Sequence, residues 1–200
     1  MTEDKKDNGQ GTAPGRIFII SAPSGTGKTT LCRAVCRRMP DLAYSVSYTT
    51  RPPRAGEIDG RDYHFISIPE FLKGIETGRW VEWAKVHGNY YGTSAHDLDA
   101  WRSAGRDVLL DIDVKGAMRI REQYPDCIMI FISPPSLSVL EERLRNRGTD
   151  TPETIAIRLR NAEKEMAASG SYDHVIVNRV LKDAVNELET IIRSARRAGS

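Results

Sequence analysis

The feature that most constrains this chain is a glycine-rich loop set between a strand pattern and a helix pattern. The apolar run Ile17–Ile20 leads into the loop Ala22–Thr29, and a helical pattern covers Lys28–Met39. Gly25 and Gly27 let the backbone bend so that successive N–H groups point at one anion, and the start of the helix adds its positive dipole end. Strand, loop and helix together predict a phosphate-binding loop, although an alanine stands where the first glycine of such loops usually lies.

The same loop supplies side chains suited to a nucleoside triphosphate and its metal ion. Lys28 offers a flexible positive charge to the β- and γ-phosphates, and the Thr29 hydroxyl is placed to ligate Mg²⁺. The alternative is a glycine-rich turn with an exposed lysine, which would leave the agreement of strand, loop and helix unexplained. The residues expected to hold the triphosphate are Ser24, Gly25, Thr26, Gly27, Lys28, Thr29 and Thr30.

Further apolar runs without polar alternation indicate buried parallel strands. They are Val108–Leu110, Ile128–Ile132 and Val175–Val177, and helical patterns cover Ser136–Arg147 and Asp183–Arg197. Strands that alternate with helices predict an α/β fold, in which helices flank a parallel sheet.

Capping signals predict where other helices begin. Capping boxes are expected at Ser67–Glu70 and Ser138–Glu141, and Thr151 followed by Pro152 is typical of an N-cap and a first helical position. A short helix is also expected over residues 94–104, before a glycine.

An acidic residue ends the second of the predicted core strands. Asp111 directly follows the apolar run and would lie at the carboxyl edge of the sheet, where ligands of open α/β sheets bind. We expect Asp111 to meet the metal together with Thr29; the alternative is an acid that caps the next turn. Because strand side chains alternate, Asp111 and Asp113 should point to the same face.

The stretch from Tyr44 to Gly105 breaks the alternation of strands and helices and suggests an inserted subdomain. It contains Arg51 and Arg54, which are three positions apart and stiffened by two prolines. Planar guanidinium groups match phosphate bidentately, and Tyr63 could add a neutral donor. Taken alone, this segment is more simply interpreted as a solvated basic loop.

Composition sets the wider limits. The 200 residues, of which 40% are hydrophobic and 28% charged, suffice for one domain with a buried core. A net charge of +2 gives no reason to expect nucleic acid or a membrane surface as partner, and no apolar run is long enough to span a membrane. The three cysteines lack a framework spacing, which indicates a reducing cytoplasm. Residues 1–15 are expected to be a flexible tail, and the oligomeric state stays open, with a homo-oligomer among the options.

Together, these motifs resemble those of the guanylate kinase family. The segments that carry the resemblance are Ala22–Thr29, Ser47–Glu57, Asn89–Thr93, Leu110–Asp113 and Val175–Asn178, in the family's order between Arg16 and Arg197. The resemblance implies a P-loop core (16–48, 106–135 and 161–197), a GMP-binding subdomain (49–105) and a helical lid (136–160). It also implies that a phosphoryl group moves from ATP to GMP with the assistance of Mg²⁺.

The resemblance further implies a role for individual residues. The GMP phosphate would be held by Ser47, Arg51, Arg54, Tyr63 and Tyr91, and the guanine edge by Glu82, Thr93 and Asp113. Asn178 would lie near the adenine of ATP, and Arg143, Arg147 and Arg158 would close on the transferring phosphoryl group. With Lys28 and Arg51 these arginines form the expected catalytic set, because phosphoryl transfer needs positioning and charge stabilisation rather than a nucleophilic side chain.

Two other functions stay open at this point. Guanylate kinase-like domains also occur as non-catalytic interaction modules, but these typically lack a working P-loop, whereas Gly27, Lys28 and Thr29 are all present here. A kinase of the same fold could instead use AMP, UMP or a small alcohol as acceptor.

Overall fold

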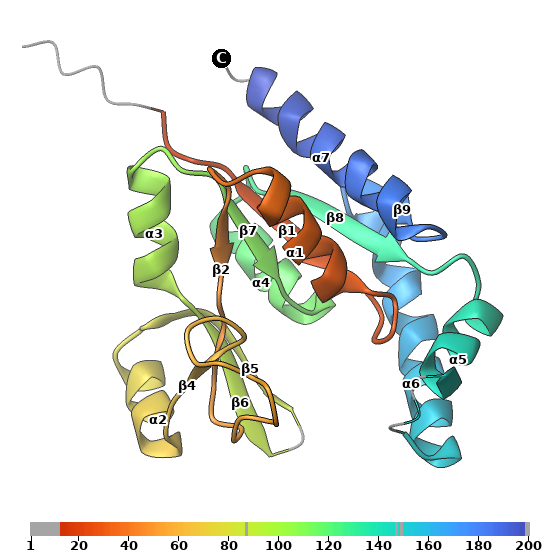
Figure 1. The fold of residues 1–200 in the computed structure, drawn as a ribbon. Helices are drawn as coiled ribbons and strands as arrows, with labels where there is room; N and C mark the ends of the chain where they lie inside the picture. Colours follow the sequence, from red (N-terminus) through yellow and green to blue (C-terminus); the bar gives the residue numbers. More distant parts are fainter. Residues whose placement is uncertain (1–12, 87, 147, 149, 199–200) are drawn as a thin grey trace, which may run out of the picture.

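The structure is a computed structural model that describes residues 13–86, 88–146, 148 and 150–198. It contains a five-stranded sheet, a smaller four-stranded sheet below it in Figure 1, and a pair of helices to one side. The predicted phosphate loop belongs to the part with the larger sheet, and the inserted stretch forms the smaller sheet. The candidate site lies where these two parts meet.

The larger sheet contains the four predicted strands and one that the sequence pattern misses. Its order is β2-β7-β1-β8-β9, and all neighbouring strands run parallel. The missed strand, β2, has only three residues, too few to form a legible apolar run. The strands are β1 (Ile17–Ser21), β2 (Ala43–Ser45), β7 (Val108–Asp111), β8 (Ile128–Ser133) and β9 (His174–Val177).

Helices cover both faces of this sheet, because alternate residues of a buried strand point to opposite sides. Phe18 and Ile20 of β1 belong to the core cluster shared with α1 and α7, whereas Ile17 and Ile19 belong to the cluster shared with α3 and α4. The α/β fold with a flanked parallel sheet is thus the one predicted from the sequence. The bounds are α1 (Lys28–Arg38), α3 (Ala95–Ser103), α4 (Val114–Gln123) and α7 (Leu181–Arg197).

The smaller sheet, in the order β4-β3-β6-β5, is built entirely from the inserted stretch. One face packs on helix α2, where Phe71 stacks on Trp80 with ring centroids 4.5 Å apart. Gly74 allows this close approach, since a Cβ there would lie 2.7 Å from the indole nitrogen of Trp80. The bounds are β3 (Tyr48–Thr49), β4 (His64–Phe65), α2 (Ile68–Glu76), β5 (Trp80–Val86) and β6 (Asn89–Ser94).

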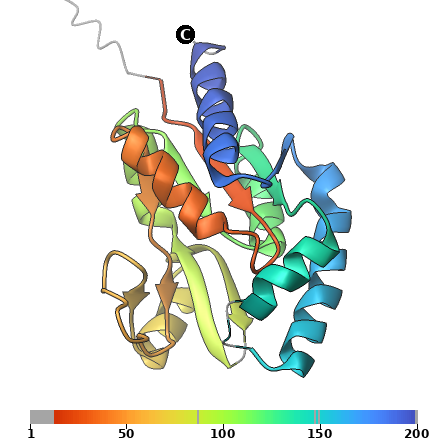
Figure 2. The ribbon, with the colours of Figure 1, turned by 45° about the vertical axis from the view of Figure 1, so that its right-hand side comes forward.

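The helix pair consists of α5 (Leu137–Asn146) and α6 (Pro152–Ala167), followed by the 3₁₀ turn Ala168–Ser171. The pair has its own small core, in which Leu140 and Leu144 meet residues of α6. Figure 2 shows the pair beside the loop that follows β1. No helix in the described part of the chain is long and apolar enough to cross a membrane.

The predicted helix caps have different outcomes. Ser67 and Thr151 cap α2 and α6 as expected, each accepting a hydrogen bond from the backbone N–H three residues later. The capping box predicted at Ser138 is wrong, because α5 begins at Leu137 and the cap is Ser136, which accepts from the N–H of Val139 at 3.2 Å. Only Ser138 is followed by an acid three positions later, but the hydroxyl of Ser136, directly after two prolines, takes the cap.

Most of the predicted tail, residues 1–12, lies outside the described residues. Gly15, assigned to that tail, is buried, and its N–H donates to the carbonyl of Arg102 at 2.8 Å. A Cβ at Gly15 would lie 1.9 Å from the carbonyl oxygen of Arg106, so only glycine fits there.

Candidate active site

The loop between β1 and α1 has the backbone geometry of an anion cradle. Gly25 and Gly27 have φ values of 92° and 91°, a left-handed conformation that glycine adopts without steric cost. Thr26 closes the loop by donating its hydroxyl to the carbonyl of Pro23 at 2.7 Å, and Asn178 donates its amide to the carbonyl of Thr26 at 2.8 Å. The residue that follows β9 therefore helps to hold the phosphate loop in place.

Lys28, Thr29 and Asp111 meet at the carboxyl edge of the sheet. The Lys28 ammonium lies 2.7 Å from Asp111 Oδ1, and the Thr29 hydroxyl donates to Asp111 Oδ2 at 3.1 Å. Tyr44, on the strand that the sequence pattern misses, donates its hydroxyl to the same oxygen at 3.3 Å. Burial alone would lower the pKa of Lys28, but the Asp111 carboxylate outweighs it and the pKa rises, so the lysine stays charged.

The oxygens of Thr29 and Asp111 fit a magnesium ion. One hydroxyl and one carboxylate, adjacent to a site for phosphates, match a metal that keeps several waters and takes few protein ligands. The arrangement also answers the alternative for Asp111, whose carboxylate accepts from side chains and does not cap the next turn.

A cavity of about 570 Å³ opens between the edge of the core sheet and the smaller sheet. The core contributes Lys28, Thr29 and Asp111 to its wall, while the inserted stretch contributes Ser47 and Tyr91. Such a volume lies in the usual range for a small-molecule site. Lys28 and Thr29 of the predicted triphosphate site therefore share one space with residues of the predicted acceptor site. Gly25, Thr26, Gly27 and Thr30 line a separate, smaller cavity.

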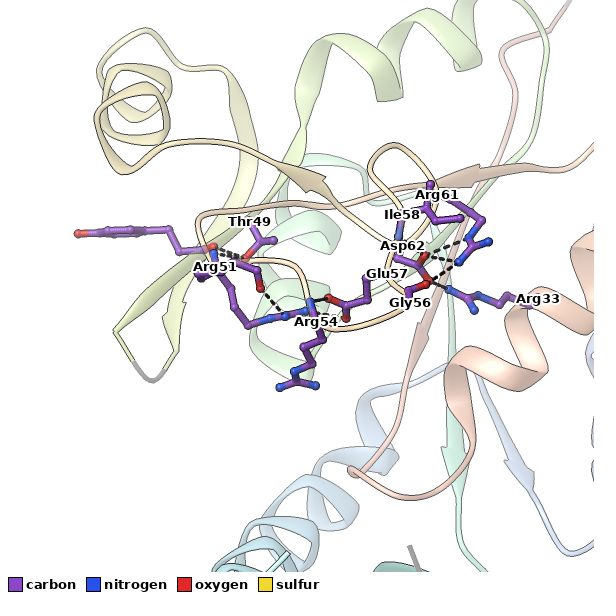
Figure 3. Close-up of polar contacts among 11 residues, drawn as sticks. Arg33, Thr49, Arg51, Arg54, Gly56, Glu57, Ile58, Arg61 and Asp62 are labelled. Atoms are coloured by element: carbon purple, nitrogen blue, oxygen red, sulfur yellow. Dashed lines mark hydrogen bonds and ion pairs between the residues drawn. The ribbon is translucent and has the colours of Figure 1, made fainter. Parts of the chain in front are cut away.

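The basic segment of the inserted stretch is a largely exposed loop that internal hydrogen bonds hold in shape. The Arg51 guanidinium donates to Glu57 at 2.8 Å, and the other oxygen of Glu57 accepts from the N–H of Arg54 at 2.7 Å (Figure 3). Arg51 also lies over the ring of Tyr63, 5.5 Å from its centroid. The guanidinium of Arg54 is exposed and points away from this network in Figure 3.

Two tyrosines complete this end of the cavity. The rings of Tyr63 and Tyr91 meet edge to face with centroids 6.0 Å apart, and both line the cavity. From the sequence we expect Tyr63, and from the family resemblance Tyr91, to donate to the acceptor phosphate, and the structure places both rings on the wall of one cavity.

Glu82, Thr93 and Asp113 gather at the other end of the cavity, around the start of α4. Thr93 donates its hydroxyl to Glu82 at 2.8 Å, and Asp113 accepts from the N–H of Gly116 at 2.7 Å. A Cβ on Gly116 would lie 2.9 Å from one Glu82 oxygen and 3.4 Å from one of Asp113, so the glycine makes room for both carboxylates. Burial raises the pKa of Glu82 to about 7; the Thr93 hydroxyl opposes the shift and the charge of Asp113 adds to it.

The position of Asp113 corrects one expectation. Strand β7 ends at Asp111, and Asp113 is the N-cap of α4 rather than a second strand residue, so the expected reason is wrong, although both carboxylates line the same cavity. The alternation rule stops applying where the chain leaves the strand.

The arginines of the predicted lid occupy separate places. Arg158 donates to the hydroxyl of Ser24 in the phosphate loop at 2.6 Å, and it pairs with Asp150 at 3.2 Å. Arg143 donates to the carbonyl of Asn178 at 2.9 Å, and both residues line a second cavity of about 210 Å³ on the far side of the phosphate loop. Arg147 lies outside the described residues.

The large cavity is also lined by residues that the sequence reasoning did not select, among them Arg33, Tyr44, Glu57 and Asp62. Glu57 lies within the basic motif and Asp62 directly precedes Tyr63, so their positions gave a signal that could have been used. No signal pointed to Arg33 or Tyr44, because one lies in an ordinary helical pattern and the other on the unrecognised strand.

A parallel sheet whose first strand runs through this glycine-rich loop into a helix defines the class of P-loop nucleotide-binding enzymes. A family model described as Guanylate kinase matches residues 14–195. The chain belongs to the guanylate kinase family and is a nucleoside monophosphate kinase, as its sequence motifs predicted.

Relatives and one solved structure show how far the similarity extends. The chain is 49% identical to a guanylate kinase of Aromatoleum aromaticum over 183 residues, covering 92% of this chain and 90% of that one. It is 51% identical to a guanylate kinase of Syntrophotalea carbinolica over 178 residues, covering 89% and 85%. The crystal structure of guanylate kinase from Anaplasma phagocytophilum matches with a TM-score of 0.73 at 33% identity, covering 91% of this chain and 86% of that one.

Proposed function

We propose that this chain transfers the γ-phosphoryl group of ATP to GMP in the large cavity, giving ADP and GDP, with each predicted residue in the role described below. Its membership of the guanylate kinase family supports the reaction. The observation that carries the assignment of roles is that Lys28 and Glu82 line the same cavity, although Lys28 begins α1 of the core and Glu82 lies on β5 of the smaller sheet.

The triphosphate side is formed by the phosphate loop. The N–H groups of residues 24–30 would surround the phosphates, and Lys28 would exchange its contact with Asp111 for one with the β- and γ-phosphates. Asn178, which lines the smaller cavity, would lie near the adenine of ATP.

Magnesium would be held by the Thr29 hydroxyl and the Asp111 carboxylate. When bound, the ion would neutralise negative charge on the phosphates. The chain's own part is to keep these two oxygens at the phosphate loop, where Tyr44 and Lys28 orient the carboxylate.

The acceptor phosphate would be held beside Ser47, Tyr63 and Tyr91, which line the cavity and would supply hydroxyl donors. Arg51 and Arg54 are not among the lining residues; held by Glu57 in the adjoining loop, they would turn toward the phosphate to supply guanidinium groups. Glu57 keeps Arg51 extended beside the cavity wall, so one face of the guanidinium is already oriented before the nucleotide arrives.

The guanine base would lie against Glu82, Thr93 and Asp113. Guanine presents N1–H and a 2-amino group as donors, which two carboxylates can accept, while the Thr93 hydroxyl can donate to O6. Adenine offers neither of these donors and would leave the acids unpaired.

Transfer itself would need no general base, because the phosphate of GMP is already an anion at neutral pH. Lys28 and the arginines Arg143, Arg147 and Arg158 would stabilise charge on the transferring group as the predicted lid closes. Closure over the cavity would also exclude water, which otherwise competes with GMP as the acceptor.

A coupled assay of ADP release tests the proposal. GMP, AMP, UMP and a small alcohol would be offered as acceptors, and GMP is expected to give the highest kcat/KM. Comparable turnover of another acceptor would overturn the assignment of the guanine-binding residues. Absence of turnover with every acceptor would favour the interaction-module alternative.

A further inference from the structure

One ion pair joins the helix of the phosphate loop to the acceptor-binding loop across the rim of the large cavity. Arg33 is the sixth residue of α1, and its guanidinium contacts the carboxylate of Asp62 (Figure 3). Asp62 lies in the inserted stretch, and both residues line the cavity. The pair therefore spans the two parts of the molecule that must hold the donor and the acceptor.

The Asp62 carboxylate is oriented by its own loop. Its Oδ2 accepts from the N–H of Ile58 at 2.9 Å and from Arg61 at 3.0 and 2.8 Å, which leaves Oδ1 for Arg33 (Figure 3). The hydrogen bond from Ile58, followed by the contact with Arg33, lowers the pKa of Asp62 to about 2. The acid is thus charged at any physiological pH, and its geometry is set before Arg33 adds the link.

The loop that Asp62 anchors carries the residues assigned to the GMP phosphate. Tyr63 is the next residue, and Glu57, which holds Arg51, lies at the other end of the same turn. Asp59 reinforces the turn by accepting from the N–H of Phe65 at 2.8 Å. Fixing Asp62 against α1 fixes the distance from the phosphate loop to these donors.

We propose that Arg33 and Asp62 are positioning residues that hold the acceptor-binding loop in register with the phosphate loop. The inference rests on the proposed function of this cavity. The pair touches neither the reacting atoms nor the base, and acts through Tyr63 and the Arg51–Glu57 pair. It sets the affinity for GMP and leaves the chemical step unchanged.

Single substitutions test this role. Arg33→Gln is expected to raise the KM for GMP about fivefold, the upper range for a partly exposed ion pair, while kcat and the KM for ATP stay within about twofold. Arg33→Lys should recover most of the affinity, because an ammonium can still pair with Asp62. The matched control is Arg38→Gln, which removes the same charge from the same helix at a pair with Glu189; it should behave as the parent.

A double-mutant cycle separates positioning from direct contact. If the pair acts as a unit, Asp62→Asn raises the KM for GMP as much as Arg33→Gln does, and the double variant is no worse than either. If Arg33 instead binds the nucleotide itself, Asp62→Asn frees it and the KM stays the same or falls, which overturns the proposal. An unchanged KM in Arg33→Gln also overturns it.

Equilibrium binding of GMP keeps this test apart from that of the proposed function. A parent that binds GMP but does not phosphorylate it would contradict the proposed reaction, while the affinities of the variants would still decide the role of the pair. Thermal unfolding of each variant within a few degrees of the parent shows that the affinity changes do not come from lost structure.

Discussion

Lys28 and Asp111 compensate each other's charge at the edge of the core sheet, where the ammonium lies 2.7 Å from the carboxylate. The Lys28 ammonium also donates to the carbonyl of Ile112 at 2.8 Å, and this hydrogen bond helps to hold it at the strand edge. An arriving triphosphate offers more negative charge than one carboxylate and can draw the ammonium away. The Lys28 side chain thus pairs with Asp111 in the free protein and would stabilise charge on the phosphates of the bound nucleotide.

Lys28→Met should abolish phosphoryl transfer and preserve the fold. Methionine keeps the apolar stem, and Asp111 retains its contacts with Thr29 and Tyr44, but the charge on the phosphates goes unneutralised. The loss in kcat/KM should exceed about 100-fold, or about 2.7 kcal/mol. Steady-state kinetics checks the loss of activity, and circular dichroism checks that the fold is preserved. Lys73→Met, on the exposed side of α2, is the control. Activity within about tenfold of the parent would contradict the role of Lys28.

Glu82→Gln should lose activity mainly with GMP. The variant keeps the shape of the side chain and its contact with Thr93, but an amide cannot accept both donors of guanine. Unsatisfied groups cost roughly 1–3 kcal/mol each, so kcat/KM for GMP should fall about 10- to 100-fold, with little change in the low activity on AMP. Glu122→Gln, an exposed acid on α4, is the matched control. Equal losses on both nucleotides would remove Glu82 from base recognition.

The pKa of Glu82, near 7, predicts a pH dependence of GMP binding. Guanine donors bind the ionised carboxylate, so the affinity for GMP should rise as the pH passes from 6 to 8. For folding the sign is opposite: a carboxyl with a raised pKa favours the folded state below its ordinary pKa, and this contribution is lost as the pH rises through 7. The GMP phosphate also titrates near pH 6, but it does so equally in the parent and in Glu82→Gln. The difference between the pH profiles of GMP affinity for these two proteins therefore reports the titration of Glu82. Parallel profiles would contradict the prediction.

At the level of elements, the sequence predicted what local rules determine. The strand of Ile17–Ile20, the phosphate loop and the caps Ser67 and Thr151 all depend on residues close together in the chain. The short strand β2 and the choice between two serines at α5 depend on packing and chain direction, which no local pattern records.

The same division runs through the site. The motifs predicted Lys28 and Thr29 from their spacing, and the family resemblance selected Glu82, which the structure places on the same cavity. The ion pair of Arg33 with Asp62 joins positions 29 residues apart, and only the folded chain brings them together.

Gly74→Ala tests the packing of α2 on the smaller sheet. Alanine normally favours a helix over glycine by about 1 kcal/mol, but here its Cβ would lie 2.7 Å from the Trp80 indole. We expect overpacking to prevail and to destabilise the protein by roughly 1–3 kcal/mol. The control is Gly170→Ala, where an added Cβ meets nothing within 4 Å. A higher melting temperature for Gly74→Ala would show that the indole moves aside without cost.

At the scale of the whole molecule, three parts meet around the nucleotide sites: the core sheet, the smaller sheet and the helix pair. Arg158 already reaches Ser24 from the helix pair, and Leu144 lies close enough that a Cβ on Gly25 would come within 2.8 Å of it. Both helices of the pair therefore lie against the phosphate loop, α5 through Leu144 and α6 through Arg158.

Binding of ATP and GMP analogues together should slow hydrogen exchange in residues 63–105 and 136–160. Closure would protect amides in both segments, because each gains contacts that the separate nucleotides do not provide. Each analogue alone serves as the control and should protect mainly its own side. Unchanged exchange with both bound would contradict closure of the predicted lid.

Asp113 ties the choice of base to the integrity of a helix. The same carboxylate that lines the cavity beside Glu82 caps α4 through the N–H of Gly116. Evolution or design toward another base cannot simply delete it, since alanine at an N-cap costs about 1 kcal/mol. Asparagine caps as well as aspartate does while changing the charge that faces the ligand. New specificities should therefore arise more readily through Asp113→Asn than through any smaller residue. Few substitutions at this position can change the preferred base and still cap the helix.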